Sequence, residues 1–104
     1  MTKISVMEAN TFALEMAKEA LAHPLVTAWH REVGWRHFKI VSNDAPAATI
    51  SIRRRGELKD ITAHCEMEYQ GNHVVGGTIE LIIGDQTWQF TCRLTATRTM
   101  MIWA

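Results

Sequence analysis

The sequence predicts an α+β fold: a two-layer sandwich with an N-terminal helix, or helix pair, packed on a five- to six-stranded antiparallel meander. From Ile61 to Ala96, apolar and polar residues alternate with a period of two, and turn residues interrupt the alternation twice. This pattern is typical of three successive strands with one buried face and one solvated face. Upstream of them, apolar residues recur at helical spacing. Because the sheet must cover its apolar face, we expect the helices to lie on it.

The N-terminal segment predicts one helix or two. Ser5 opens a Ser-x-x-Glu capping box, and the helix that follows is expected to end near Ala22. Pro24 suits the first position of a second helix, and Gly34 suits its C-terminal stop. A single bent helix over Val6–Val33 is the alternative. The apolar stripe of the first helix comprises Val6, Ala9, Phe12, Ala13, Met16, Ala17, Ala20 and Leu21.

Two shorter strands are expected before the three long ones. The first covers residues 37–42, and a turn at 43–46 separates it from a second strand over 48–53. A further turn at 55–57 leads into the long strand that opens near Lys59. These segments complete the meander at its N-terminal side.

Turn chemistry sets the register of the last hairpin. Gly84-Asp85 suits a two-residue turn, which places Leu81 opposite Trp88 and Ile79 opposite Phe90. We therefore expect Trp88 and Phe90 to be anchors of the core. All four residues fall on one face of the sheet, and we expect the helices to cover that face.

The register of the preceding hairpin is expected to follow from a Gln70-Gly71-Asn72 turn. Pairing Tyr69 with His73 places Cys65 opposite Gly77, two strands away from Cys92 and beyond the reach of a disulfide. Both thiols are then expected to be free and buried, which fits a reducing cytoplasm. The same register predicts an ion pair between Arg93 and Glu66 across Gly76. It also places Val74 and Ile82 on the polar face, where they would interrupt it. The adjacent Gly76 and Gly77 indicate a bulge or a strong twist.

The stretch from Gln86 to Trp103 is too long for one strand of a domain this size. We expect a bend near Thr97–Arg98 and a separate final strand over Thr99–Trp103. That segment is apolar on both of its faces, so it is either a buried strand or an edge that contacts another chain.

Length and charge limit the function classes. The 104 residues are expected to form a single α+β domain, 1–104. The net charge is zero, which argues against nucleic-acid binding. The charges are nevertheless segregated: residues 36–59 carry six Lys or Arg and two acids, whereas residues 60–85 carry five acids and no Lys or Arg. No apolar run approaches the length of a membrane span, so no membrane partner is expected.

Candidate chemistry on the polar face is sparse. His64, Glu66 and Glu68 alternate on one strand, and Glu80 is expected nearby. Such residues are able to bind a divalent metal or act as an acid–base pair. A solvated sheet face requires the same polar residues, so we expect no catalytic residue, no cofactor and no metal site.

Two function classes survive, and the first is a non-catalytic protein-binding module, not an enzyme. Small inhibitors, immunity proteins and phage or mobile-element accessory proteins are often of this size, and they act by occupying a partner protein. The partner is another protein or a second copy in a homodimer. The expected partner-binding residues are Met101 and Trp103 as anchors, Arg53, Arg54 and Arg55 as steering charges, and Glu66, Glu68 and Arg93 on the polar face.

The second class is a small-ligand-binding or enzymatic α+β domain. Its pocket would lie between the helix and the sheet, lined by Trp29, Trp88, Tyr69 and a histidine. The inward positions of the predicted strands are almost uniformly apolar, which favours the binding module.

Overall fold

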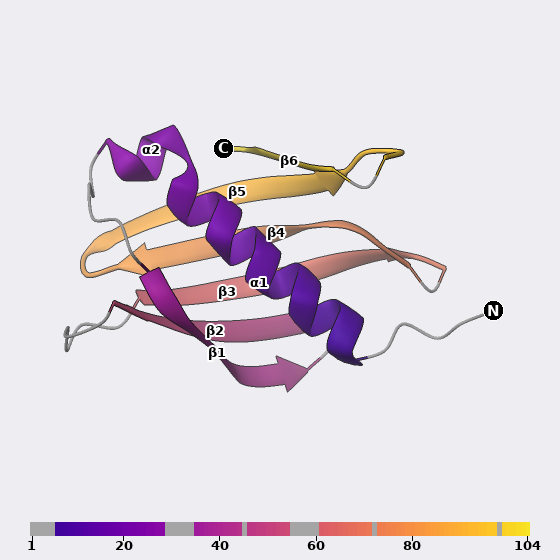
Figure 1. Ribbon diagram of the computed structural model, residues 1–104, viewed down its shortest axis with the longest axis horizontal. Helices are drawn as coiled ribbons and strands as arrows, with labels where there is room; N and C mark the ends of the chain where they lie inside the picture. The colour runs from indigo at the N-terminus through magenta and orange to yellow at the C-terminus, as the bar shows by residue number, and fades with distance from the viewer. Residues whose placement is uncertain (1–5, 29–34, 45, 55–60, 72, 98) are drawn as a thin grey trace.

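The fold is a six-stranded antiparallel meander covered on one face by an N-terminal helix (Figure 1). The computed structural model describes residues 6–28, 35–44, 46–54, 61–71, 73–97 and 99–104, and of residues 6–10, 35–38, 42–44 and 53–54 it describes the backbone alone. The elements are α1 (Val6–Ala22), α2 (Pro24–Thr27), β1 (Trp35–Asp44), β2 (Ala47–Arg54), β3 (Ile61–Gln70), β4 (His73–Ile83), β5 (Gln86–Leu94) and β6 (Met100–Trp103). The strands follow one another in sequence order across the sheet, as predicted.

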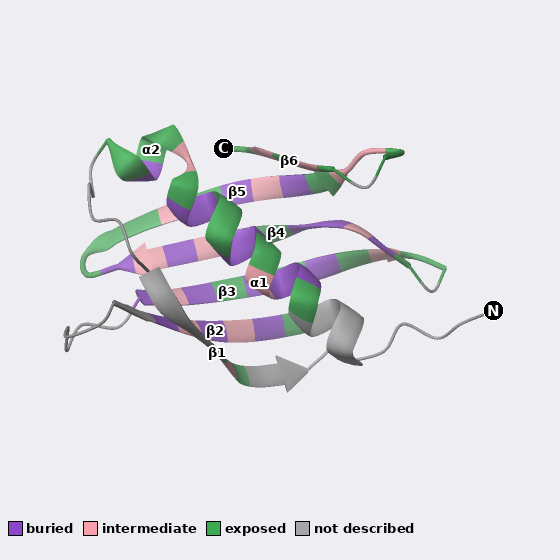
Figure 2. Cartoon of the chain, in the orientation of Figure 1, coloured by how far each residue is buried: buried purple, intermediate pink, exposed green. Residues whose placement is uncertain are grey.

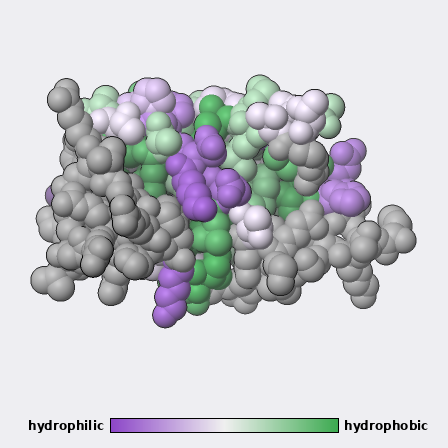
Figure 3. Space-filling view, in the orientation of Figure 1, coloured by the Kyte–Doolittle hydropathy of each residue, from purple (hydrophilic) through white to green (hydrophobic). Residues whose placement is uncertain are grey.

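Helix α1 lies across the sheet on its apolar stripe. Phe12, Ala13, Met16, Ala17, Ala20 and Leu21 are all buried. Glu15, Lys18 and Glu19 are exposed, and hydrophilic residues gather at the centre of this side of the molecule (Figure 3). The alanines remove side-chain bulk from the stripe, which lets the helix backbone approach the strands. The predicted N-cap residue, Ser5, lies outside the described residues.

Helical structure is interrupted at His23, between α1 and α2, so the alternative of one bent helix is wrong. His23 has an extended backbone (φ −66°, ψ 138°), and its ring Nδ1 accepts a hydrogen bond from the Leu25 N–H at 3.2 Å. Pro24 follows as the first helical residue, as predicted. Helix α2 ends at Thr27, well before the predicted stop at Gly34, which lies outside the described residues.

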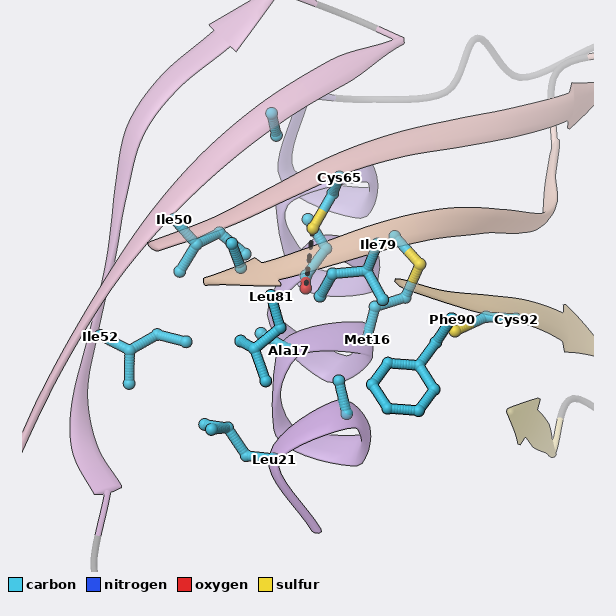
Figure 4. Close-up of a cluster of buried hydrophobic side chains, with 14 of the residues drawn as sticks. Met16, Ala17, Leu21, Ile50, Ile52, Cys65, Ile79, Leu81, Phe90 and Cys92 are labelled. Carbon is cyan, nitrogen blue, oxygen red and sulfur yellow. Dashed lines mark hydrogen bonds between the residues drawn. The ribbon is translucent and has the colours of Figure 1, made fainter. Parts of the chain in front are cut away.

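The core fills the space between α1 and the sheet (Figure 4). Its strand members alternate with exposed or half-buried residues, and the two classes are interleaved along β3–β5 in Figure 2. Phe90 is 2% exposed, whereas Trp88 is half-buried against the edge of the core. The His23 ring lies 4.7 Å from the Phe90 ring, so the start of α2 is held against β5. The expectation of core anchors is confirmed for Phe90 and holds in part for Trp88.

Both cysteines are free and buried, as predicted. The Cys65 thiol lies 3.9 Å from the Ala13 carbonyl oxygen of α1 (Figure 4). Burial raises the pKa of Cys65 from its ordinary value of 9.0 to about 12, and proximity to Cys92 adds to this shift. Burial, and then the charge of Glu19, raises the pKa of Cys92 to about 11.

The predicted register of β3 and β4 is wrong by two positions. Gln70, not Tyr69, pairs with His73, because the turn has two residues, with Gly71 at φ +63°. A register shift between Glu68 and Tyr69 then leaves Val75 as an extra residue on β4. As a result Cys65 lies opposite Ile79 rather than Gly77.

The same bulge reverses the orientation of Val74. Period-two counting back from Ile79 places Val74 on the polar face, but the extra residue turns it inward, and it is 1% exposed. A Cβ atom on Gly76 would collide with the Cys92 backbone carbonyl, and one on Gly77 with that of Glu66. The two glycines therefore permit the close backbone approach at this part of the sheet. The sequence indicates a bulge or a strong twist at these glycines, and the bulge lies at the preceding residue, Val75.

The β4–β5 register is as predicted: Leu81 pairs with Trp88 and Ile79 with Phe90. Strand β5 ends at Leu94, and a turn at Ala96–Thr97 leads to β6, which agrees with the predicted bend and separate final strand. The Thr95 N–H donates to the Thr99 carbonyl oxygen at 2.9 Å, and the Thr99 N–H donates to Thr95 Oγ1 at 3.1 Å. These two bonds close the loop and direct β6 back along β5.

Candidate protein interface

The face of the sheet opposite α1, here called the open face, is organised as rows of cross-strand neighbours. One row runs Glu66, Thr78, Thr91, Trp103 from β3 to β6. The adjacent row runs Glu68, Gly76, Arg93, Met101. The first row is polar over β3–β5, the second carries charged residues on β3 and β5, and both are apolar at β6. The apolar edge is thus continuous with a polar face.

Strand β6 presents different side chains to its two sides. Met100 and Ile102 pair with Leu94 and Cys92, face the helix layer and are half-buried. Met101 and Trp103 face the open side and are 52% and 42% exposed. Figure 2 shows this alternation of intermediate and exposed residues along β6.

The sequence predicts an apolar segment on both faces, and the structure bears this out. Strand β6 is also an edge of the sheet, because it pairs with β5 alone in the part of the chain that is described. Edge strands carry backbone N–H and C=O groups that are free to pair with another chain.

Arg93 and Glu68 form an ion pair beside this apolar edge. The Arg93 Nη2 atom lies 3.5 Å from Glu68 Oε2, and both side chains are more than half exposed. The two residues are the cross-strand neighbours of Gly76 on β3 and β5, so no side chain of β4 stands between them. The prediction of an ion pair across Gly76 is therefore right in kind, but its acid is Glu68, because of the shifted register, and not Glu66.

The open face is hollowed between β3 and the C-terminal end of the chain. The hollow has a volume of about 610 Å³. Side chains of the open face that line it are His64, Glu66, Thr78, Glu80, Gln89 and Thr91, with Ala47 and Ala104 also bordering it. It lies on the side of the sheet away from α1, so it is not the pocket between helix and sheet that the sequence suggested for a ligand-binding domain. Of that pocket's expected lining, Trp88 and Tyr69 pack against the apolar core, and Trp29 lies outside the described residues.

Polar side chains that line the hollow form hydrogen bonds with one another or with a neighbouring residue. Thr49 Oγ1 and His64 Nδ1 are 3.2 Å apart, and Gln89 Nε2 donates to Glu80 Oε2 at 3.2 Å. His64 and Glu80 are also direct cross-strand partners. Across the described residues, no three His, Cys, Asp or Glu side chains come together in a way that would hold a metal ion.

Two of the three arginines proposed to steer a partner, Arg53 and Arg54, have their backbone away from this surface. The backbone of Arg53 and Arg54 ends β2, paired with β1, and Arg55 lies outside the described residues. Strands β2 and β6 are separated by β3, β4 and β5, which is about 19 Å at the usual strand spacing. Met101, Trp103, Arg93, Glu68 and Glu66 do share the open face, in two adjacent cross-strand rows, and we call these five residues the edge patch.

Sequence reasoning missed two features of the surface. The first is the hollow, since a period-two pattern identifies a polar face without giving its curvature. The second is a pair of exposed apolar residues away from the edge patch, Leu25 in α2 and Val41 in β1, which are 51% and 61% exposed. Val41 falls at a register shift in β1, an irregularity that alternation alone does not predict.

Neither helix in the described part of the chain has the length and apolar character needed to cross a bilayer. Comparison of the chain with protein-family models, with curated proteins and with solved structures found no match.

Proposed function

We propose that this chain is a non-catalytic protein-binding module that acts by occupying a partner through the edge patch. The single observation that carries the proposal is the position of Met101 and Trp103, both about half exposed, side by side on the open side of an edge strand. Met and Trp are enriched at the cores of protein interfaces. An inhibitor or immunity protein uses a surface of this kind.

The chemistry of the patch supports an interface with an apolar centre and a charged rim. Met101 and Trp103 offer apolar area, and the strand edge offers backbone hydrogen bonds. Arg93 and Glu68 border them as a pair of opposite charges, and Glu66 continues the rim toward the hollow. Rim charges of this kind set orientation and association rate more than affinity.

The proposal includes a reducing compartment, the cytoplasm. Two buried thiols on neighbouring parts of one core support it, because proteins that fold in oxidising compartments commonly pair their cysteines.

The experiment is affinity capture with the full chain as bait, with captured proteins quantified by mass spectrometry. The test variant is Met101→Asp combined with Trp103→Ala. The matched control is Leu25→Asp, which alters an equally exposed apolar residue outside the edge patch. A partner captured by the wild type and the control, but depleted at least about 30-fold with the test variant, supports the proposal. Equal capture by all three baits contradicts it.

A second candidate is the binding of a small ligand in the hollow of the open face. Its volume and the convergence of His64, Glu66 and Glu80 on it favour a small cationic ligand. Titration with arginine methyl ester, followed by NMR of the His64 ring, tests this candidate. Saturable shifts that are lost in Glu80→Gln support it, and unchanged spectra up to about 10 mM contradict it.

A further inference from the structure

The two edges of the sheet are built differently. Strand β1 contains three charged residues, Arg36, Lys39 and Asp44, and its pairing with β2 is interrupted by two register shifts. Charges and bulges are the usual protection of an edge strand against pairing with another chain. Strand β6 contains no charged residue and no proline, and its pairing with β5 is regular over all four residues. One edge is therefore protected and the other is free to accept a strand.

We propose that the strand accepted by β6 is the β6 of a second copy of this chain, paired antiparallel about a two-fold axis. This inference rests on the proposed function, because it takes the edge patch as the interface. An axis perpendicular to the sheet places the open faces of both copies on the same side and the helix layers on the other. In an antiparallel pair, directly opposed residues point to the same side of the sheet. The allowed registers are therefore those in which two opposed residues both face the open side or both face the helix side.

The register centred on Ile102 makes the fullest use of the apolar side chains. Ile102 opposes its own counterpart on the helix side. On the open side Met101 opposes the second copy's Trp103, and Trp103 opposes the second copy's Met101. Four half-exposed apolar side chains thus form one cluster, and the half-buried Met100 and Ile102 are covered on the other side. A register centred on Met101 would oppose Trp103 to Thr99 and leave the indole partly uncovered.

A second copy suits this edge because it supplies apolar residues on both faces at once. A strand from another protein would have to offer apolar side chains on both its helix side and its open side. A second β6 does so by symmetry, because it is the same strand. Charge does not oppose the contact: the net charge of the chain is zero. The nearest described cations, Arg93 in each copy, would lie three strand spacings apart, about 14 Å, and each is already paired with Glu68. That distance exceeds the Debye length of about 8 Å at physiological salt.

Protection of the β1 edge limits the assembly to a dimer. A head-to-tail contact between β6 and the β1 of another copy would repeat without limit and form a fibre. The charges and register shifts of β1 disfavour that contact. Pairing of β6 with β6 uses up both free edges, so it stops at a dimer. In that dimer the two open-face hollows lie on the same side of one continuous sheet.

Two measurements on the full chain test the inference. Sedimentation velocity compares the wild type with Met101→Asp/Trp103→Ala, with Leu25→Asp as the surface control and Val41→Asp as the control for the β1 edge. Disulfide trapping compares Ile102→Cys with Met100→Cys under mild oxidation. Both variants are made in a Cys92→Ala background, because Cys92 is the direct cross-strand partner of Ile102 within the same chain and its thiol would otherwise pair with the new one. The remaining native thiol, Cys65, is buried. Directly opposed Cα atoms are about 4.5–5.5 Å apart, within the range of a disulfide.

The inference predicts a wild-type dimer at about 100 μM, a dimer of both control variants, and association weakened at least about 30-fold in the double variant. It further predicts that Ile102→Cys is trapped as a covalent dimer, whereas Met100→Cys, whose counterpart is about 14 Å further along the strands, is not. A monomeric wild type overturns the inference, as does a dimer that persists in the double variant or trapping at Met100 alone. The wild type could also be monomeric in sedimentation while affinity capture still finds a partner that depends on Met101 and Trp103. That result would overturn the second copy as the partner and leave the proposed function standing.

Discussion

Arg93 lies across Gly76 from Glu68, with 3.5 Å between Arg93 Nη2 and Glu68 Oε2. This contact depends on the register of β3, β4 and β5. The bulge between β3 and β4 places Glu68 opposite Gly76, whereas without the bulge Glu66 would take that position. The contact also marks where the polar open face meets the apolar residues of β6.

A double-mutant cycle tests this register in solution. Arg93→Ala combined with Glu68→Gln should show a coupling free energy of about 0.2–1 kcal/mol, the usual value for an exposed pair. The same cycle with Glu66→Gln is the matched control and should show coupling near zero. The measurement is chemical unfolding of the single and double variants. A larger coupling free energy with Glu66 than with Glu68 would contradict the bulge and support the register in which Glu66 lies opposite Gly76.

Substitution of Gly77 by alanine should destabilise the fold. An added Cβ would meet the Glu66 backbone carbonyl. That carbonyl belongs to β3, so its displacement would disturb the hydrogen bonds of the sheet. We expect a loss of more than about 1 kcal/mol beyond that of Thr78→Ala, an exposed neighbour on the same strand. Urea unfolding of the two variants provides the comparison. Equal stabilities would mean that β3 and β4 lie further apart at this point.

The two thiols should make the stability of the fold fall at high pH. The folded state keeps both protons up to a pKa of about 12 for Cys65 and about 11 for Cys92, whereas unfolded thiols titrate near 9.0. Above pH 9 the unfolded state therefore binds fewer protons, and the free energy of unfolding decreases as the pH rises toward 11. Each thiol contributes at most about 1.4 kcal/mol per pH unit.

Unfolding of the wild type and of Cys65→Ala between pH 8 and 10.5 isolates the contribution of one thiol. The variant should be less stable at pH 8 but show a shallower decline. A thiol reagent should label no cysteine in the native protein and two after denaturation. Labelling of Cys65 in the native state at pH 8 would place that residue outside the core.

Phe90 should contribute more to stability than Trp88, although tryptophan is the larger residue. Phe90 is almost completely buried against α1 and the His23 ring, whereas Trp88 is half-buried. Phe90→Ala should cost about 3–5 kcal/mol, and Trp88→Ala clearly less. Urea unfolding orders the two variants, and the reverse order would place the core nearer the Gly84-Asp85 turn.

Local pattern was sufficient for the fold class, the end of α1, the start of α2 and the β4–β5 register. These features depend on residues close together in the sequence: Pro24 at a helix start, Gly84-Asp85 at a turn, and apolar alternation along each strand. The β3–β4 register depended on a bulge at Val75, next to Gly76 and Gly77. The glycines indicated a bulge or a strong twist, but the alternation did not give the position of the extra residue, so the register could not be counted through it.

For the candidate site, the pattern was sufficient to predict that the final strand is apolar on both faces, but not which charged residues lie beside Met101 and Trp103. The two-sided apolar character of residues 99–103 is a local property. The distance of Arg53 and Arg54 from β6 is set by the order of six strands, and the identity of the Arg93 partner is set by the bulge. Both are tertiary properties that the alternation of a single strand does not contain.

The central claim is that Met101 and Trp103 serve association and not folding. Equilibrium unfolding of the wild type and of Met101→Asp/Trp103→Ala over a hundredfold range of protein concentration tests it most directly. The claim predicts that the wild-type midpoint rises with concentration, that the variant midpoint does not, and that the two converge at the lowest concentration, because a dimer gains stability by mass action. A variant less stable than the wild type by the same amount at every concentration would contradict the claim and assign both side chains to the core.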